Sequence, residues 1–114
     1  MIRSIKMKIR IFAAVLPLVV QAGVALAQDV GDAQKGREFA RQTCASCHAI
    51  SQQDVASPVE KATPFRIVAN TPGMTGTALT VWLSTPHPTM PNLVVREQDR
   101  YDVIAYILSL RERR

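Results

Sequence analysis

Cysteines and aromatic residues are scarce in this 114-residue chain, which holds two cysteines and 5% aromatics. Two cysteines exclude a scaffold held by several disulfides and a zinc site built from four thiolates. The length allows one domain with a modest core, and domains of this size often need a metal or a cofactor to fold firmly. The 47% apolar content still indicates a folded protein rather than a disordered tail.

An uninterrupted apolar run long enough to cross a bilayer is also missing. Residues 11–20 are apolar but contain Pro17, whereas a membrane span needs about 18 clean apolar residues. The ten residues before this stretch carry four bases and no acid, and the tripeptide ALA closes the segment at Ala27. This layout predicts a cleaved signal peptide over residues 1–27 and an exported domain over residues 28–114, with an uncleaved anchor as the alternative.

Excess positive charge is missing from the predicted exported domain. The whole chain has a net charge of +5, from 14 Lys and Arg against 9 Asp and Glu. Four of the bases and none of the acids lie in the signal segment, so the remaining 87 residues have a net charge of +1. A nearly neutral domain has no electrostatic basis for binding nucleic acid, and we expect no such partner.

Helical periodicity is clearest at the two ends of the exported domain. Asp32 is well placed to accept hydrogen bonds from the free backbone N–H groups of a helix over about Ala33–Thr43. Apolar residues at positions i, i+4 and i+7 predict another helix over about Gln98–Arg111. No stretch alternates in the manner of a strand, so we expect an all-α fold.

Prolines are frequent in the chain between these two helices. Thr63 and Pro64 are the predicted N-cap and first residue of a short turn through residues 65–68. Thr77 is the expected cap of a short helix that ends before Pro86. The rest is predicted to form long, stiff loops, and loops of that length need something to wrap around.

The sequence CASCH at residues 44–48 is the strongest indication of function. CxxCH is the attachment motif for c-type haem. Each cysteine sulfur adds to one haem vinyl group, and the adjacent histidine can then serve as the proximal ligand of the iron. We therefore expect one covalent haem c, attached through Cys44 and Cys47, with its iron bound by His48.

Three other interpretations of the motif stay open. A CxxC pair can exchange between thiol and disulfide, although such a pair normally begins a helix and this one follows a helix. Cys44, Cys47 and His48 could join His87 in a zinc site, although His87 is about forty residues away and has no paired ligand motif. The two cysteines could also form a plain disulfide in an oxidising compartment.

Haem iron has a second axial position, for which the chain offers Met90, His87 and Met74. Met90 lies in the sequence PHPTMP at residues 86–91, whose three prolines restrict the backbone. A thioether on a stiff loop suits iron that keeps the same coordination in both oxidation states. We therefore expect Met90 as the sixth ligand, with His87 or an open site as alternatives and with Met74 more suited to filling the core.

In the order and spacing of its motifs, the chain is similar to the small bacterial class I c-type cytochromes over residues 29–114. As in that family, Gly31-Asp32 opens a helix leading to CxxCH, Met90-Pro91 follows a loop that carries a proline, and Ala105-Tyr106 lies on the last helix. The resemblance implies a small cytochrome c-like fold of three to four short helices, with long loops wrapped around one covalent haem.

The resemblance also implies that the first and last helices cross, with Gly36 allowing their close approach and Tyr106 packing at the crossing. The family usually has an aromatic residue four positions after this glycine, whereas Phe39 comes three after it. The family's loop proline offers its backbone carbonyl to the proximal imidazole. Here that proline is Pro64 or Pro58, with Pro64 favoured.

From these residues we predict a periplasmic single-haem electron carrier that is not an enzyme. Two protein ligands leave the iron no open position for oxygen, peroxide or substrate. Single electrons are expected to pass by outer-sphere transfer, through an exposed haem edge, to and from protein redox partners. The carrier is either a monomer or, as an alternative, the haem c subunit of a periplasmic dehydrogenase. A haem protein with a labile sixth site, acting as a peroxidase or gas sensor, is an alternative from another class.

Overall fold

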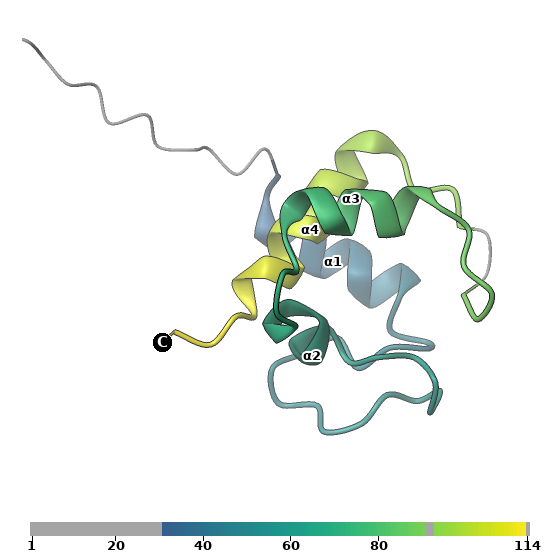
Figure 1. Ribbon diagram of the computed structural model, residues 1–114, viewed down its shortest axis with the longest axis vertical. Coiled ribbons are helices and arrows are strands. Elements are labelled where there is room, and N and C mark those ends of the chain that lie inside the picture. Colours follow the sequence, from purple (N-terminus) through teal and green to yellow (C-terminus); the bar gives the residue numbers. More distant parts are fainter. Residues whose placement is uncertain (1–30, 91–92, 114) are drawn as a thin grey trace, which may run out of the picture.

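The computed structural model describes residues 31–90 and 93–113 (Figure 1). The predicted signal peptide lies outside this part of the chain. The described residues form four helices and no strands: α1 (Ala33–Thr43), α2 (Phe65–Asn70), α3 (Gly76–Ser84) and α4 (Glu97–Ser109). The expected all-α class is therefore confirmed. Within the same residues, no helix has both the length and the apolar character that crossing a membrane requires.

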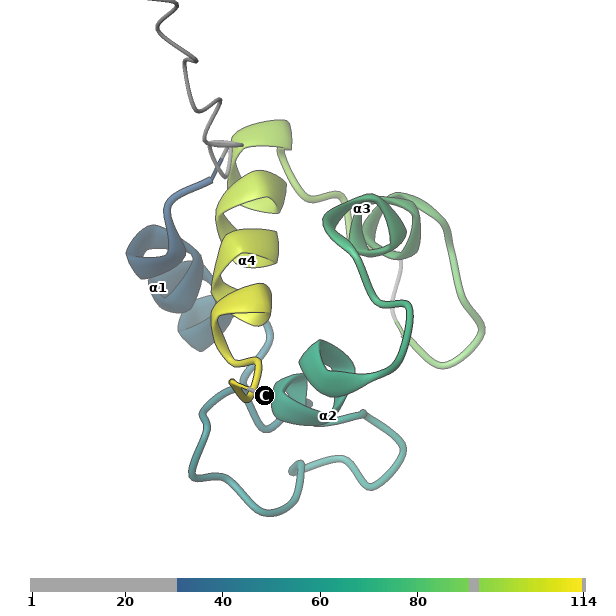
Figure 2. The same cartoon turned by 60° about the vertical axis from the view of Figure 1, so that its left-hand side comes forward.

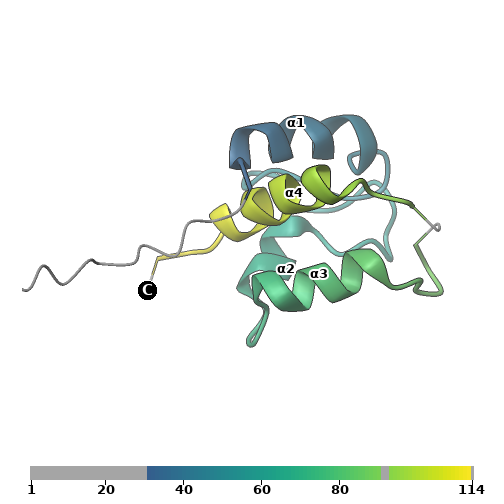
Figure 3. The ribbon, with the colours of Figure 1, turned by 90° about the horizontal axis from the view of Figure 1, so that it is seen from above.

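Helix α4 is the centre of the fold. It contacts each of the other three helices. Figure 3 shows it between α1 on one side and the pair α2 and α3 on the other. Its apolar residues Val103, Ile104 and Ile107 are buried and form one cluster with Phe65 of α2 and Leu79 of α3. The core therefore depends on the apolar stripe of α4 that the sequence periodicity predicts.

Helices α1 and α4 lie against each other, and Figure 2 shows them side by side. A Cβ added at Gly36 would collide with the backbone carbonyl of Asp102, so only glycine permits this approach. Ala40 is one turn further along the same face of α1 and is fully buried. The crossing and the role of Gly36 are thus confirmed. Phe39, three positions after Gly36, packs against the apolar core and lines a central cavity.

Two hydrogen bonds of α4 residues fix this helix to the chain around α1. The Tyr106 hydroxyl donates to the carbonyl of Ile50, in the loop after the CxxCH motif, over 2.8 Å. The buried carboxylate of Asp102 accepts hydrogen bonds from the Asp32 backbone N–H at 2.8 Å and from the Gln98 amide at 3.0 Å. The sequence pattern did not single out Asp102, yet it joins the start of α1 to α4.

The predicted ends of the helices differ in how well they agree with the structure. Helix α1 has the predicted bounds, and the Asp32 carboxylate caps it. Helix α4 begins one residue earlier than predicted and ends at Ser109, two residues earlier. The cap of α3 is Thr75 rather than Thr77, because the Thr75 hydroxyl accepts the hydrogen bond from the Ala78 N–H.

The short turn predicted after Thr63 is a longer helix with a different start. Helix α2 extends to Asn70, and its N-cap position falls on Pro64 without a side-chain hydrogen bond. Thr63 is therefore not the cap. Proline holds the residue before it in an extended conformation, and this leaves the Thr63 carbonyl outside the helix and available to another partner.

Candidate functional site

A cavity of about 430 Å³ brings the four predicted site residues together. Cys44, Cys47, His48 and Met90 all lie on its wall. Its volume is within the range of cofactor pockets, roughly 300–1,000 Å³. Much of the remaining wall is apolar: Phe39, Phe65, Val68, Leu79, Val103 and Ile107. An apolar cavity that carries two thiols, an imidazole and a thioether fits a flat, largely apolar macrocycle with a central metal ion.

The two cysteines follow directly from the end of α1. The Cys44 N–H donates to the Ala40 carbonyl at 2.8 Å, and the N–H groups of Cys47 and His48 both donate to the Cys44 carbonyl, at 3.1 and 2.8 Å. These turns hold the motif against a helix that is itself packed on α4. Both cysteines are free thiols in this structure, so the plain disulfide interpretation gains no support.

The Cys44 thiol has an unusually high pKa. Burial raises the pKa of this group to about 11, and the neighbouring Cys47 adds to the shift. The thiol therefore stays protonated at neutral pH. A redox-active CxxC pair needs the opposite, a lowered pKa that produces the reactive thiolate. This counts against the thiol–disulfide exchange interpretation.

The zinc interpretation also lacks a site. Among residues 31–90 and 93–113, no three His, Cys, Asp or Glu side chains gather closely enough to hold a metal ion. His87, the fourth ligand that this interpretation needs, contacts Met90 instead.

His48 is oriented by a backbone carbonyl and an aromatic ring. Its Nδ1 lies 2.8 Å from the carbonyl oxygen of Thr63, and its ring centroid is 5.4 Å from that of Phe65. A carbonyl can only accept, so Nδ1 carries the proton and the lone pair of Nε2 is free for a metal ion. The predicted acceptors, Pro64 and Pro58, are wrong. Pro64 contributes indirectly, because it restricts the backbone of Thr63, whose carbonyl accepts the hydrogen bond.

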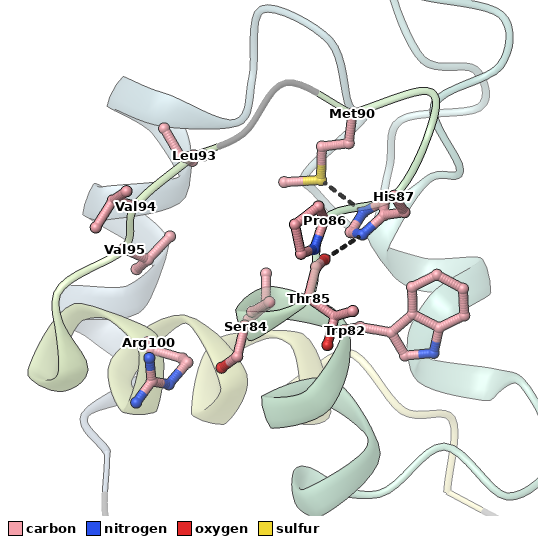
Figure 4. A pocket seen from close by; sticks show the side chains of 11 residues that line it. Trp82, Ser84, Thr85, Pro86, His87, Met90, Leu93, Val94, Val95 and Arg100 are labelled. Atoms are coloured by element: carbon pink, nitrogen blue, oxygen red, sulfur yellow. Dashed lines mark hydrogen bonds between the residues drawn. The ribbon is translucent and has the colours of Figure 1, made fainter.

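The two candidates for the sixth ligand lie next to each other on the same cavity wall. The Nε2 atom of His87 is 3.1 Å from the sulfur of Met90, and its Nδ1 is 2.9 Å from the Thr85 carbonyl (Figure 4). Met74 also lines the cavity but is packed partly against the core, as expected for a gap-filling methionine. The structure thus leaves Met90 and His87 as a close pair.

Two contributors to the site escaped the sequence analysis: the carbonyls of Thr63 and Thr85. Trp82 lies on the cavity wall with 55% of its surface exposed, and its ring meets His87 edge-on at 5.2 Å. Each threonine precedes a proline, but this dipeptide alone is no signal, because it also occurs at Thr71-Pro72.

Comparison with known proteins agrees with this geometry. The family model for cytochrome c matches residues 33–111. The chain is 33% identical to cytochrome c-552 of Bradyrhizobium diazoefficiens over 97 residues, which is 85% of this chain and 89% of that protein. The comparison with solved structures gave no significant match. Cys44 and Cys47 fit the haem attachment motif of the family. The chain therefore belongs to the cytochrome c family, as a monohaem electron-carrying protein with covalently bound haem c as its cofactor.

Proposed function

We propose that this cytochrome is a periplasmic electron carrier in which Cys44 and Cys47 hold the haem while His48 and Met90 bind its iron. The observation that carries the proposal is that one apolar cavity collects all four side chains. The haem supplies reversible one-electron chemistry at its iron, and the protein supplies attachment, ligands and surroundings.

The His48 side of the cavity supports a permanent ligand. The hydrogen bond from Nδ1 to the Thr63 carbonyl fixes the tautomer of the ring and makes Nε2 a stronger donor. Phe65, which is buried, packs on the same ring and limits its rotation. A ligand held in one orientation needs little rearrangement when an electron arrives or leaves.

Met90 suits the second axial position because of its chemistry and its backbone. A thioether is a soft, weak donor, and Met/His ligation raises the reduction potential of a haem. Met90 ends a turn in which its N–H donates to the His87 carbonyl at 3.2 Å, with Pro88 between them as a residue that favours such turns. With both His48 and Met90 bound to it, the iron would have no place for a substrate, which favours a carrier over a peroxidase or gas sensor.

Exposed apolar side chains on the cavity wall support electron exchange at the surface. Trp82 and Leu93 both line the cavity, and 55% and 41% of their surfaces are exposed. A cavity rim of this kind gives a redox partner a small contact area, as expected for brief encounters. The predicted signal peptide over residues 1–27 supports export. The near-neutral exported domain gives little electrostatic steering toward its partners, which favours a dedicated partner over promiscuous collision.

The test is spectroscopy on the exported protein made in cells that mature c-type cytochromes. Intact mass should equal residues 28–114 plus one haem, and the ferric protein should show the weak far-red band of sulfur-to-iron ligation. Met90→Leu should remove this band, whereas the matched control Met74→Leu, from the same cavity, should retain it. A bare polypeptide mass, or a band that survives in Met90→Leu, would contradict the proposal. Purification with a dehydrogenase subunit would contradict the free carrier.

A further inference from the structure

His87 occupies the cavity wall and contacts Met90, yet the proposed ligand set gives it no role. Its ring is held on three sides: by the Thr85 carbonyl at 2.9 Å, by the edge-on ring of Trp82 at 5.2 Å, and by the Met90 sulfur at 3.1 Å (Figure 4). A loop histidine that was merely solvated would not need such support. These three contacts fix the orientation of a side chain whose function the proposed ligand set does not explain.

The hydrogen bond to Thr85 decides which nitrogen of His87 can bind a metal ion. A backbone carbonyl only accepts, so Nδ1 of the neutral ring carries the proton. The lone pair is then on Nε2, the atom that faces the Met90 sulfur. A thioether sulfur also offers only lone pairs. Two Lewis bases therefore lie 3.1 Å apart on the same part of the cavity wall.

The surroundings of His87 repeat those of His48. In each case Nδ1 points to the carbonyl of a threonine that precedes a proline, Thr63 for His48 and Thr85 for His87. In each case an aromatic ring packs against the imidazole, with centroids 5.4 and 5.2 Å away. Histidines that bind metal ions almost always donate their second ring nitrogen in this manner. His87 thus has the hydrogen bond and the aromatic contact that are typical of a metal-binding histidine, although the proposed ligand set assigns its side of the iron to Met90.

The turn that contains His87 and Met90 makes an exchange between them short. The Met90 N–H donates to the His87 carbonyl, so the two residues are the ends of a single turn. With Nε2 and the sulfur 3.1 Å apart, a displacement of about that distance brings the nitrogen to the place of the sulfur.

We propose that His87 is a reserve axial ligand, which binds the haem iron through Nε2 when Met90 leaves the iron or is lost. The inference rests on the proposed function, because it presupposes iron held between His48 and Met90. It adds that this chain has two six-coordinate states, one with sulfur and one with nitrogen on the Met90 side. The second state is expected to have the lower reduction potential, because methionine ligation raises it.

The test compares four variants of the haem-loaded protein: Met90→Leu, His87→Phe, Met90→Leu/His87→Phe and the control Met90→Leu/Thr89→Ala, which changes a neighbouring cavity residue. Leucine conserves the volume of methionine, so the fold should survive. Haem attachment is verified by intact mass. The readouts are the spin state of the ferric protein by electron paramagnetic resonance, and the affinity of the ferrous protein for carbon monoxide.

We expect Met90→Leu and the Thr89 control to lose the sulfur band yet stay low-spin, and the His87→Phe double variant to become high-spin. Carbon monoxide should bind the double variant at least about tenfold more tightly than Met90→Leu. In Met90→Leu, His87 bound to the iron would reduce the fraction of protein that is able to bind carbon monoxide. Added imidazole should return only the double variant to the low-spin state.

The outcomes separate this inference from the proposed function. A high-spin Met90→Leu protein that binds carbon monoxide as tightly as the double variant would overturn the reserve ligand. It would leave the sulfur ligation of the unmodified protein intact. A far-red band that shifts in His87→Phe alone, together with a high-spin Met90→Leu, would instead identify His87 as a hydrogen-bond donor to the sulfur and would equally overturn the inference.

Discussion

The two histidines on the cavity wall have the same immediate surroundings but very different supports. Both point Nδ1 at a threonine carbonyl and both pack on an aromatic ring. His48 follows α1, which is locked against α4, and its aromatic neighbour Phe65 is buried. His87 lies in a turn beyond the end of α3, and its neighbour Trp82 is 55% exposed.

We infer from this difference that local hydrogen bonding orients a histidine as a ligand, whereas packing around it decides whether it is the permanent ligand. On the His48 side the described residues offer a single imidazole on a rigid support. On the His87 side they offer a nitrogen and a sulfur on one short turn. We therefore interpret the two sides as a fixed half and an adjustable half of the same site.

Replacing each histidine in turn should reveal the difference between the two halves with the largest effect. We expect His48→Ala to lower the yield of haem-loaded protein by at least about tenfold, since even the loss of an outer partner typically costs a metal site 10- to 100-fold. His87→Ala should leave the yield near that of the unmodified protein, because Met90 still completes the site. The yield is measured as haem per polypeptide after purification. Equal losses in the two variants would show that the halves are not different.

The rigid half can be weakened without touching a ligand, by adding a methyl group at the helix crossing. Gly36→Ala would bring a Cβ into the carbonyl of Asp102, and we expect it to lower the free energy of unfolding by about 1–3 kcal/mol, the usual cost of overpacking. Gly76→Ala is the matched control: its Cβ would meet Ile104 Cγ2 at 3.7 Å, an ordinary contact. That variant should stay within about 1 kcal/mol. Denaturant unfolding of both proteins makes the comparison, and equal stabilities would contradict the close crossing.

The rigid half is also the part that the sequence predicts best. The start of α1 follows from a side-chain cap at Asp32, and the crossing that the family resemblance implies is marked by Gly36 within the helix. The attachment motif is contiguous, so its spacing is visible before any folding. Each of these features depends on the identity of particular residues and is therefore visible in the sequence.

Features that depend on backbone groups or on tertiary placement cannot be recognised from residue identities in the sequence. The acceptor for His48 is a carbonyl, which every residue has, and the prediction missed it by one position at Pro64. Asp102 is one polar residue on a helix, and only the packed structure shows that it is buried and accepts the Asp32 N–H. The contact of His87 with Met90 depends on the turn between them, so the sequence named both as candidates without placing them together.

A small electrostatic contribution also belongs to the rigid half. Glu38 lies on the exposed face of α1, two turns before the attachment motif. Its carboxylate accepts hydrogen bonds from Arg41, at 2.7 and 3.0 Å, and from Gln42. The hydrogen bond with Arg41, followed by that with Gln42, lowers the pKa of the Glu38 carboxyl from 4.5 to about 2.

The sign of the resulting pH dependence follows from that lowered pKa. A carboxyl that loses its proton more easily in the folded protein stabilises the fold above its unfolded pKa of 4.5, and this stabilisation disappears as the pH falls toward 2. We expect Glu38→Gln to lower the melting temperature slightly at pH 6 and to make no difference near pH 2, the smallest of these effects because the pair is exposed. Glu60→Gln, which removes the same charge from a loop, is the charge-matched control. Melting curves across this pH range test both variants, and a Glu38→Gln difference that persists unchanged near pH 2 would mean that the residue acts through something other than its charge.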